Sequence, residues 1–235
     1  MITIYTDGSS IGNPGPGGWG AIIWYSGGVV KELGGKHEHT TNNRMELLGA
    51  IEALNYISDS ADSAHVFTDS SYLVNGITKW VHGWQKNGWL TGSKEPVLNK
   101  ELWEELFLLT KKVETLWSHL PAHVGIPPNE RVDEIAQSMS RGIQTSLYEG
   151  DYKNYGIDLT PPSKESVNNI RSSQKKSGKK SKAYSYLSIV GGKAKRHLSW
   201  EDCKKRISGI KGARYKKSVS AESEKEILKS WGVSL

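Results

Sequence analysis

The chain has 235 residues, of which 36% are hydrophobic and 24% are charged, so it can form one large globular domain or two small ones. It has one cysteine, no apolar run of the roughly 18 residues that span a membrane and no signal-peptide pattern at its start, so we expect a cytoplasmic protein without disulfides or membrane contact. The net charge of +6 divides into −6 for residues 1–150 and +12 for residues 151–235, which favours an attached nucleic-acid-binding part over a basic tail kept for solubility.

Residues 1–139 predict a mixed α/β fold. Apolar patterning indicates five strands, at residues 2–6, 19–25, 30–36, 64–68 and 115–122. Three stretches have helical spacing of apolar residues: NNRMELLGAIEALNYIS, NKELWEELFLLTKKV and NERVDEIAQSMSRGI, the last beginning at Asn129 after two prolines. Early hairpin strands followed by strands that alternate with helices predict a mixed five-stranded sheet flanked by helices.

The composition changes after this region. Residues 149–182 are rich in Ser, Lys, Asn and Pro and poor in large apolar groups, so we expect a flexible basic linker. Patterning returns in residues 183–235, where YSYLSIV and ARYKKSV predict strands, while SWEDCKKRISGI and SAESEKEILKSWG predict helices. Cys203 lies on the apolar face of the first of these helices, and Gly232 ends the second. We therefore expect a small α/β module of about 50 residues.

Four acidic side chains occur at unusual places. Asp7 and Asp69 each end an apolar strand, and Glu46 and Asp133 lie near the starts of helices. Taken singly, Asp7 is also a good turn former, and the two helical acids are also ordinary surface residues. If the fold brings all four to one sheet edge, their repulsion calls for a cation, and all-oxygen ligands suit Mg²⁺ or Mn²⁺. Two such ions could activate a water for phosphodiester cleavage.

Four motifs, TDGSSIGNPGPGGWGA, TTNNRMELLGAIEAL, FTDSSYLVNGITKWVHGW and HVGIPPNERVDEIA, occur in the order and spacing of bacterial-type ribonuclease H. Residues 1–139 thus resemble that family, and we expect a ribonuclease H-like catalytic domain over residues 1–148. The resemblance implies an endoribonuclease that hydrolyses the RNA strand of RNA–DNA hybrids with two Mg²⁺ ions, for which Mn²⁺ can substitute, leaving a 5′-phosphate and a 3′-hydroxyl. The rival hypothesis is a non-catalytic protein that binds hybrids or double-stranded RNA.

The resemblance also implies roles for single residues. Asp7, Glu46, Asp69 and Asp133 would hold the two ions, and His123 would assist proton transfer or product release. Hybrid contacts are implied for Asn13, Asn42 and Asn43 at the minor groove or backbone, for Thr41 and Asn99 at a DNA phosphate, and for Trp80, Trp84 and Trp89 in an aromatic protrusion, where Trp80 is equally expected to pack in the core. The chain departs from the family pattern at Ser71, where glutamine is frequent, at Ala122, where glycine is usual, and in a less basic protrusion.

The stretch YSYLSIVGGKAKRHLSWEDCKKRISGIKGARYKKSV resembles the hybrid-binding, or viroplasmin-like, domain of eukaryotic-type ribonuclease H, which there precedes the catalytic domain. This resemblance implies DNA-strand contacts from Trp200, Tyr215, Lys216 and Lys217, and recognition of RNA 2′-hydroxyls by the backbone near Arg214. The alternative makes the two aromatic residues part of a core and the lysines a solvated face. We expect a monomer that binds RNA–DNA hybrids, with double-stranded RNA as a further candidate partner of this module.

Overall fold

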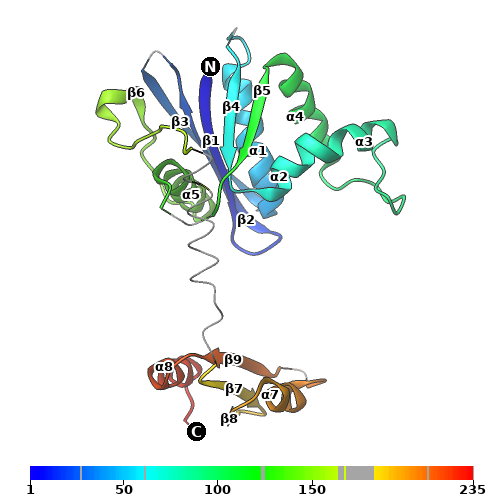
Figure 1. Ribbon diagram of the computed structural model, residues 1–235, viewed down its shortest axis with the longest axis vertical. Helices are drawn as coiled ribbons and strands as arrows, with labels where there is room; N and C mark the ends of the chain where they lie inside the picture. The colour runs from blue at the N-terminus through cyan, green and yellow to red at the C-terminus, as the bar shows by residue number, and fades with distance from the viewer. Residues whose placement is uncertain are drawn as a thin grey trace. The chain divides into compact units, whose positions relative to one another are not determined.

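The computed structural model of the chain describes residues 1–26, 28–60, 62–122, 125–163, 167, 183–210 and 212–234. These residues belong to two compact units, Met1–Ile170 and Arg171–Leu235. Each unit contains a sheet of its own, and the strands can be followed in Figure 1.

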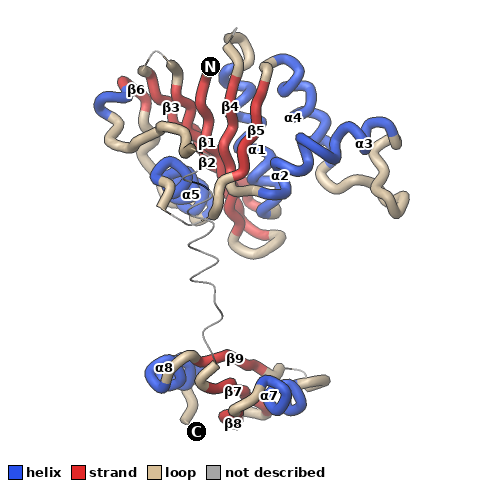
Figure 2. Tube along the Cα trace, viewed as in Figure 1, coloured by secondary structure: helices blue, strands red, loops and turns tan. Residues whose placement is uncertain are grey.

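The first unit is built on a six-stranded mixed sheet. Its strands are β1 (Ile2–Ser10), β2 (Gly15–Trp24), β3 (Val29–Thr40), β4 (Ala64–Thr68), β5 (Thr115–His119) and β6 (Glu149–Asp151). They lie in the order β5-β4-β1-β2-β3-β6, as Figure 2 shows. Strands β1, β2, β3 and β6 pair antiparallel, whereas β4 and β5 run parallel to β1. The five predicted strands are all present; the first three are longer than predicted because pairing with neighbours, rather than apolar pattern, sets their length.

Helices cover both faces of this sheet. They are α1 (Asn42–Ile57), α2 (Ser71–Asn75), the π-helix η1 (Gly76–Trp80), α3 (Val81–Lys86), α4 (Lys100–Lys112) and α5 (Pro127–Ser140). Figure 1 shows α5 on one face, and α1 and α4 on the other. Since successive strand residues point to opposite faces, Ile4 packs in the core with α1 and α4, and Tyr5 packs in the core with Val132 of α5.

The start of α5 differs from the prediction. The helix begins at Pro127, two residues before Asn129, because prolines fit a first turn whose backbone N–H groups have no helical partner. Asn129 is therefore not the cap but a buried residue inside the first turn, with 4% of its surface exposed. The prediction identified the helix correctly and misplaced this side chain.

Residues 143–160, which we call the strap, correct the predicted domain boundary. Strand β6 pairs with β3, the 3-10 helix η2 (Tyr152–Asn154) follows it, and the Tyr152 ring lies 4.8 Å from that of Trp24. Leu159 is fully buried, and Tyr5 donates a hydrogen bond to its carbonyl oxygen at 3.2 Å. The predicted five-stranded sheet, the domain end at residue 148 and the linker start at residue 149 are therefore wrong, because spaced aromatic and aliphatic residues of the strap find partners on distant strands. Residues 164–166 and 168–182 of the predicted linker lie outside the described residues.

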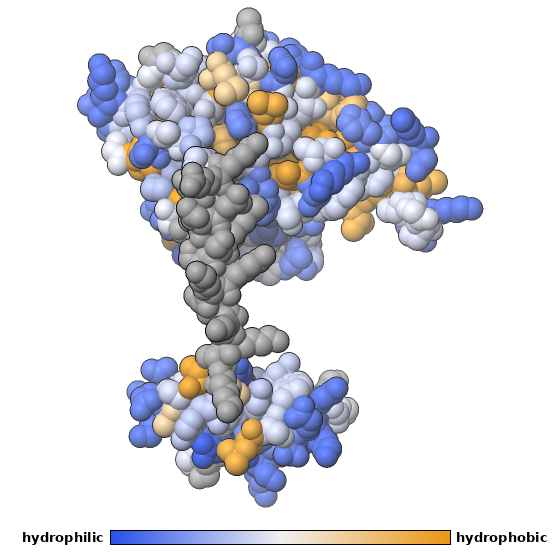
Figure 3. All heavy atoms as spheres, in the orientation of Figure 1, coloured by the Kyte–Doolittle hydropathy of each residue, from blue (hydrophilic) through white to orange (hydrophobic). Residues whose placement is uncertain are grey.

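The second unit is a three-stranded antiparallel sheet with two helices. Strands β7 (Ser185–Val190), β8 (Lys193–His197) and β9 (Arg214–Ser218) lie in the order β8-β7-β9, and the helices are α7 (Trp200–Ile207) and α8 (Ala221–Trp231). Ser199 caps α7, Gly232 ends α8 with φ 68°, and Cys203 is buried, as predicted. The sequence did not predict β8, whose residues KAKRH lack apolar alternation. This strand pairs with β7 through the backbone and through a side-chain hydrogen bond between Ser188 and His197 at 2.8 Å. Much of the visible surface of this unit is hydrophilic in Figure 3.

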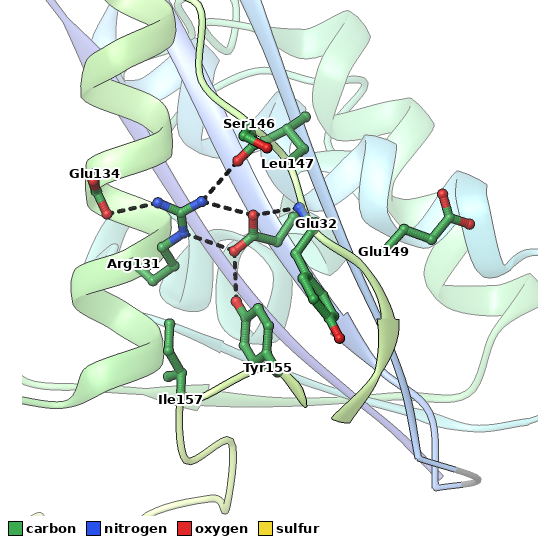
Figure 4. Close-up of a pocket in the computed structure, with 9 residues that line it drawn as sticks. Glu32, Arg131, Glu134, Ser146, Leu147, Glu149, Tyr155 and Ile157 are labelled. Atoms are coloured by element: carbon green, nitrogen blue, oxygen red, sulfur yellow. Dashed lines mark hydrogen bonds and ion pairs between the residues drawn. The ribbon is translucent and has the colours of Figure 1, made fainter. Parts of the chain in front are cut away.

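A buried carboxylate, Glu32 of β3, joins the strap to α5 (Figure 4). Burial opposes ionisation of Glu32, but hydrogen bonds from Arg131, Tyr155 and the Tyr148 N–H outweigh it and hold its pKa below the ordinary value of 4.5. A carboxyl whose pKa is lowered by folding stabilises the native state above its unfolded pKa, and this contribution disappears as the pH falls through the folded pKa.

We predict that Glu32→Gln lowers stability by about 3 kcal/mol at neutral pH, since the guanidinium of Arg131, 20% exposed, then keeps only the exposed Glu134 as a counter-charge among the described ion pairs. The difference in thermal midpoint between wild type and variant should shrink below about pH 4.5, where Glu32 of the unfolded chain begins to protonate, and disappear as the pH falls through the lower pKa of the folded protein. Circular dichroism melts between pH 7 and pH 3 measure both curves. A difference that stays constant over this range would contradict the prediction.

Candidate active site

Two of the predicted acids lie side by side because of strand register. In the parallel pair of β1 and β4, Tyr5 is opposite Phe67, so the same register places Asp7 opposite Asp69, two residues further along. Asp7 is still inside β1 and only 7% exposed, whereas Asp69 directly follows β4. The carboxyl ends of neighbouring parallel strands therefore bring these two side chains together.

Two glycines allow the helices that carry the other two acids to approach. A Cβ atom on Gly8 would lie 2.2 Å from the backbone nitrogen of Glu46, and one on Gly20 would lie 2.6 Å from the carbonyl oxygen of Val132. Asp7 precedes Gly8 in β1 and is paired with Gly20 of β2. Helices α1 and α5 thus meet the sheet beside Asp7, with Glu46 and Asp133 at the contact points. We call Asp7, Glu46, Asp69 and Asp133 the acid cluster.

This close approach predicts a strong effect of Gly8→Ala. The new methyl group would meet backbone atoms of α1 that cannot rotate away, so we expect the helix to shift and stability to fall by about 1–3 kcal/mol, with a parallel loss of cleavage. The matched control is Gly83→Ala in α3, where the added Cβ would meet nothing within 4 Å and helix propensity favours alanine. Thermal melts of both variants test this, and equal stability of the two would contradict it.

The acid cluster is electrostatically strained. Burial, followed by the charges of Asp69, Asp133 and Glu46, raises the pKa of Asp7 to about 8, although the Gly8 N–H donates to its carboxylate at 2.7 Å and partly offsets this. Burial and the charge of Asp69 raise the pKa of Glu46 to about 7, against hydrogen bonds from Ser70 and Asn42 that favour the ionised form. Without a counter-charge, the four carboxylates cannot all ionise freely at neutral pH.

Amide side chains hold the other two members of the acid cluster. Asn129 donates to Asp69 Oδ2 at 3.0 Å, and Gln137, one turn after Asp133, donates to both of its oxygens at 2.8 and 2.9 Å. The sequence analysis did not find these two amides or Ser70. The only sequence signal for Gln137 is its i+4 spacing from Asp133.

The chemistry of the acid cluster fits divalent cations. Its donors are all carboxylate oxygens, which suit Mg²⁺ or Mn²⁺, and a cation would relieve the repulsion that raises the pKa of Asp7. Within the described part of the chain, no three or more His, Cys, Asp or Glu side chains are already arranged around one metal position. The cluster therefore offers ligands of the right type without a preformed cage.

Comparison with known proteins identifies the family. The family model for ribonuclease H matches residues 1–141 of the chain. The chain belongs to the ribonuclease H family. The ribonuclease H of Thermosynechococcus vestitus is 51% identical over 146 residues, 61% of this chain and 91% of that protein. That of Maricaulis maris is 52% identical over 136 residues, 58% of this chain and 91% of that protein.

Two solved structures and a second family model also resemble this ribonuclease H. The crystal structure of LC9-RNase H1, described as a type 1 RNase H with the type 2 active-site motif, has a TM-score of 0.58 and 30% identity, and covers 72% of this chain and 84% of that one. A foamy viral protease–reverse transcriptase in complex with RNA/DNA hybrid shares the fold alone, with a TM-score of 0.53, 17% identity, and coverage of 60% of this chain and 20% of that one. The family model named ribonuclease H1 N-terminal domain matches residues 197–223, in the second unit.

These findings confirm both predicted resemblances, the ribonuclease H-like α/β fold and the class of enzyme. The chain is a ribonuclease H, which hydrolyses the RNA strand of RNA–DNA hybrids, and this family generally depends on divalent metal ions. In the described residues, no helix is both long and apolar enough to cross a membrane.

Several predicted substrate residues of this ribonuclease H gather at the start of α1. Thr41 caps that helix by accepting from the Arg44 N–H at 3.4 Å, and the Asn42 N–H donates to Asn13 Oδ1, also at 3.4 Å. Asn42 also donates to Glu46 at 2.9 Å, which links this group to the acid cluster. Asn43 is exposed on the same turn. His123 lies outside the described residues, so its predicted role stays a prediction.

Asn99 occupies a separate polar group. It has a left-handed backbone, with φ 59°, accepts from Arg44 at 3.2 Å and donates to the Tyr72 hydroxyl at 3.3 Å. The sequence analysis missed Arg44 and Tyr72, because their contacts join segments separated by 55 and 27 residues. Arg44 places a cation beside Asn99 of the predicted phosphate pocket, and it is also paired with Glu101.

The predicted aromatic protrusion has one exposed tryptophan, Trp80, and two that pack against the main core, Trp84 and Trp89. Trp80 is 40% exposed, whereas Trp84 packs against the main core, 5.5 Å between ring centroids from the buried Trp103. The ring centroids of Trp80 and Trp84 lie 5.7 Å apart. Trp80 is thus exposed to a substrate, and its ring packs against that of Trp84.

The predicted residues of the second unit lie on both faces of its sheet. Trp200 packs against Tyr215 and Tyr186, with ring centroids 5.1 and 5.6 Å apart, and Tyr215 remains 55% exposed. Lys217 is paired with Tyr186 across the sheet, so it shares this face. Lys216 and Arg214 alternate onto the opposite face, where the Arg214 guanidinium lies 5.7 Å from the Trp231 ring. The sequence analysis did not predict that Tyr186 belongs to the same group of aromatic rings as Trp200 and Tyr215.

Proposed function

We propose that this enzyme cleaves RNA in RNA–DNA hybrids by two-metal-ion catalysis, with Asp7, Glu46, Asp69 and Asp133 as metal ligands and a 5′-phosphate and a 3′-hydroxyl as product ends. Mg²⁺ is the proposed ion in the cell, with Mn²⁺ as a substitute, because both prefer oxygen ligands. When bound, the ions would supply an activated water and charge stabilisation for the leaving oxygen. His123 is proposed to assist proton transfer or product release.

The observation that carries this proposal is the crowding of acids at the ends of β1 and β4. The deepest of them, Asp7, has a pKa of about 8 because of burial and three neighbouring carboxylates. Such repulsion between carboxylates lowers the stability of the fold, whereas a site for divalent cations needs several carboxylates close together. Asp7 lies between the other acids and is the proposed shared ligand. Asn129 orients Asp69 through its hydrogen bond at 3.0 Å.

The substrate surface is proposed to extend away from the acid cluster on one side. Asn13, Asn42 and Asn43 would contact the minor groove or backbone of the hybrid, and Thr41 and Asn99, with Arg44, would hold a phosphate of the DNA strand. Trp80 would contact a sugar or base of that strand, supported by Trp84. These contacts reach the backbone and groove without selecting a base sequence.

We further propose that residues 183–235 form a hybrid-binding module and that residues 1–160 form the catalytic domain. Trp200, Tyr215 and Lys217 would contact the DNA strand from one face, and Lys216 would reach it from the edge strand β9. The backbone near Arg214 would recognise 2′-hydroxyls of the RNA strand. Double-stranded RNA is a second candidate ligand of this module. A cytoplasmic location and a monomeric state stay predictions of the sequence, to be checked by cell fractionation and sedimentation.

The test uses labelled RNA–DNA hybrid, duplex RNA and duplex DNA, each with the full-length protein in the presence and absence of Mg²⁺. We expect cleavage of the hybrid alone, only with metal, and products whose 5′ ends carry phosphate. Binding of hybrid without cleavage at any metal concentration would favour the non-catalytic alternative. Faster turnover of duplex RNA than of hybrid would overturn the proposed substrate.

A further inference from the structure

An ion pair beside the acid cluster is held from three parts of the chain. The Glu32 side chain is fully buried in β3, and that of Arg131 in α5 is 20% exposed. Arg131 donates from Nε to Oε1 at 2.8 Å and from Nη2 to Oε2 at 2.9 Å, a two-point contact that fixes the angle between the groups as well as the distance. Figure 4 shows the guanidinium and the carboxylate facing each other between helix and strand.

The strap completes this contact. The Tyr155 hydroxyl donates to Glu32 Oε1 at 2.6 Å, and the Tyr148 N–H donates to Oε2 at 2.9 Å, so each carboxylate oxygen accepts two hydrogen bonds. Arg131 Nη2 also donates to the Ser146 carbonyl oxygen at 3.1 Å. We call Glu32, Arg131 and Tyr155 the clamp.

Arg131 of the clamp lies on α5, the helix that also carries Asp133 of the acid cluster. Arg131 is midway between Asn129, which donates to Asp69, and Asp133. Val132, between Arg131 and Asp133, is fully buried, and its carbonyl lies against Gly20 beside Asp7. Any rotation or sliding of α5 would therefore move Asp133 and Asn129 relative to Asp7 and Asp69.

A buried ion pair is a poor choice for stability alone. The cost of removing two charges from water largely cancels their attraction, and apolar side chains would pack equally well. What the pair adds is directionality, because its hydrogen bonds to helix, strand and strap each require a particular distance and angle. The role of the ion pair is therefore to fix the position of α5, rather than to stabilise the fold.

We propose that the clamp positions α5 so that Asp133 and Asn129 meet the other acids in cleavage geometry. Glu32, Arg131 and Tyr155 are thus positioning residues that touch no substrate, and Tyr155 is the strap residue whose side chain takes part. This inference rests on the proposed two-metal function. It gives a role in that function to Glu32, Arg131 and Tyr155, which are not among the predicted site residues.

The test compares Tyr155→Phe and Glu32→Gln in the full-length protein with a matched strap variant, Glu149→Gln. Glu149 pairs with Lys31 of β3 and is 63% exposed, so its change removes a contact between strap and strand without touching Arg131. The measurements are kcat and KM on labelled hybrid, thermal midpoint, and binding of Mn²⁺ to the free protein by electron paramagnetic resonance. Tyr155→Phe is the mild variant, which is expected to fold even if Glu32→Gln does not.

We expect Tyr155→Phe to lower kcat by about threefold and Glu32→Gln by about tenfold, with weaker Mn²⁺ binding and unchanged KM, the low end of effects seen when supports of metal ligands are removed. Glu149→Gln should keep wild-type kcat and Mn²⁺ affinity. Unchanged kcat and Mn²⁺ affinity in both clamp variants, with only a lower thermal midpoint, would overturn the proposal. Wild-type protein that fails to cleave would instead refute the proposed function, and the Mn²⁺ titration would still decide the role of the clamp.

Discussion

Asp7→Asn is expected to abolish cleavage and, in metal-free buffer at neutral pH, to make the protein more stable. Loss of the central carboxylate removes a ligand that the proposed mechanism shares between both ions. Several kcal/mol of charge stabilisation then disappear from the transition state, so kcat should fall at least about a thousandfold. Hybrid binding should survive, since the proposed substrate contacts lie on other residues.

The gain in stability follows from the sign of the pKa shift. Folding raises the pKa of Asp7 from 3.8 to about 8, so the unfolded chain gives up this proton more readily than the native protein. Wild-type stability therefore falls as the pH rises between these two values, and the neutral amide of Asn escapes this penalty. The stability difference between variant and wild type should grow over the same pH range and shrink when Mg²⁺ is added.

The measurements are single-turnover cleavage, hybrid binding and thermal melts from pH 4 to pH 8.5. Asp59→Asn is the control, because Asp59 is 97% exposed and pairs only with Lys112 among the described ion pairs. It should keep activity and show no such pH trend. An active Asp7→Asn enzyme would remove this residue from the mechanism, and a variant less stable than wild type would refute the account of the strained site.

A chain shortened to residues 1–163 should keep metal-dependent cleavage and lose affinity for the hybrid. The second unit is proposed to contribute a separate, basic binding surface, and a tethered second contact typically strengthens binding without changing the first. We expect the dissociation constant for hybrid to rise by about tenfold to a hundredfold at low salt, with a smaller salt dependence, and processivity to fall. Cleavage at saturating enzyme should be unchanged.

A chain shortened to residues 1–148 provides the contrast. It loses β6, the buried Leu159 and the Tyr155 hydrogen bond to Glu32, so stability should fall by at least about 3 kcal/mol and kcat should fall with it. Titration of hybrid at low enzyme concentration and thermal melts separate the two truncations. Equal affinity of the 1–163 chain and the full-length enzyme would show that the second unit does not bind the hybrid.

Much of this enzyme could be predicted from local sequence patterns. Strands β1 to β5, helices α1, α4 and α5, both helices of the second unit and the cap at Ser199 could be predicted from apolar periodicity and capping residues. These signals depend on interactions within a few residues of the chain. The acids were found because each stands at the end of a strand or near the start of a helix. Strand β8 was missed because it has no apolar alternation, and its pairing depends on backbone hydrogen bonds and on a contact between Ser188 and His197 that no local pattern shows.

The sequence alone thus determined the kinds of element, the family and the four candidate acids. Only the tertiary structure decided that Asp7 and Asp69 share a register, that Gly8 and Gly20 admit two helices beside them, and that Asn129 and Gln137 hold the acids. It also reassigned residues 149–160 from linker to sheet and core. Such features depend on contacts between residues far apart in the chain, where partners are selected by packing and burial, and no short stretch of sequence carries that information.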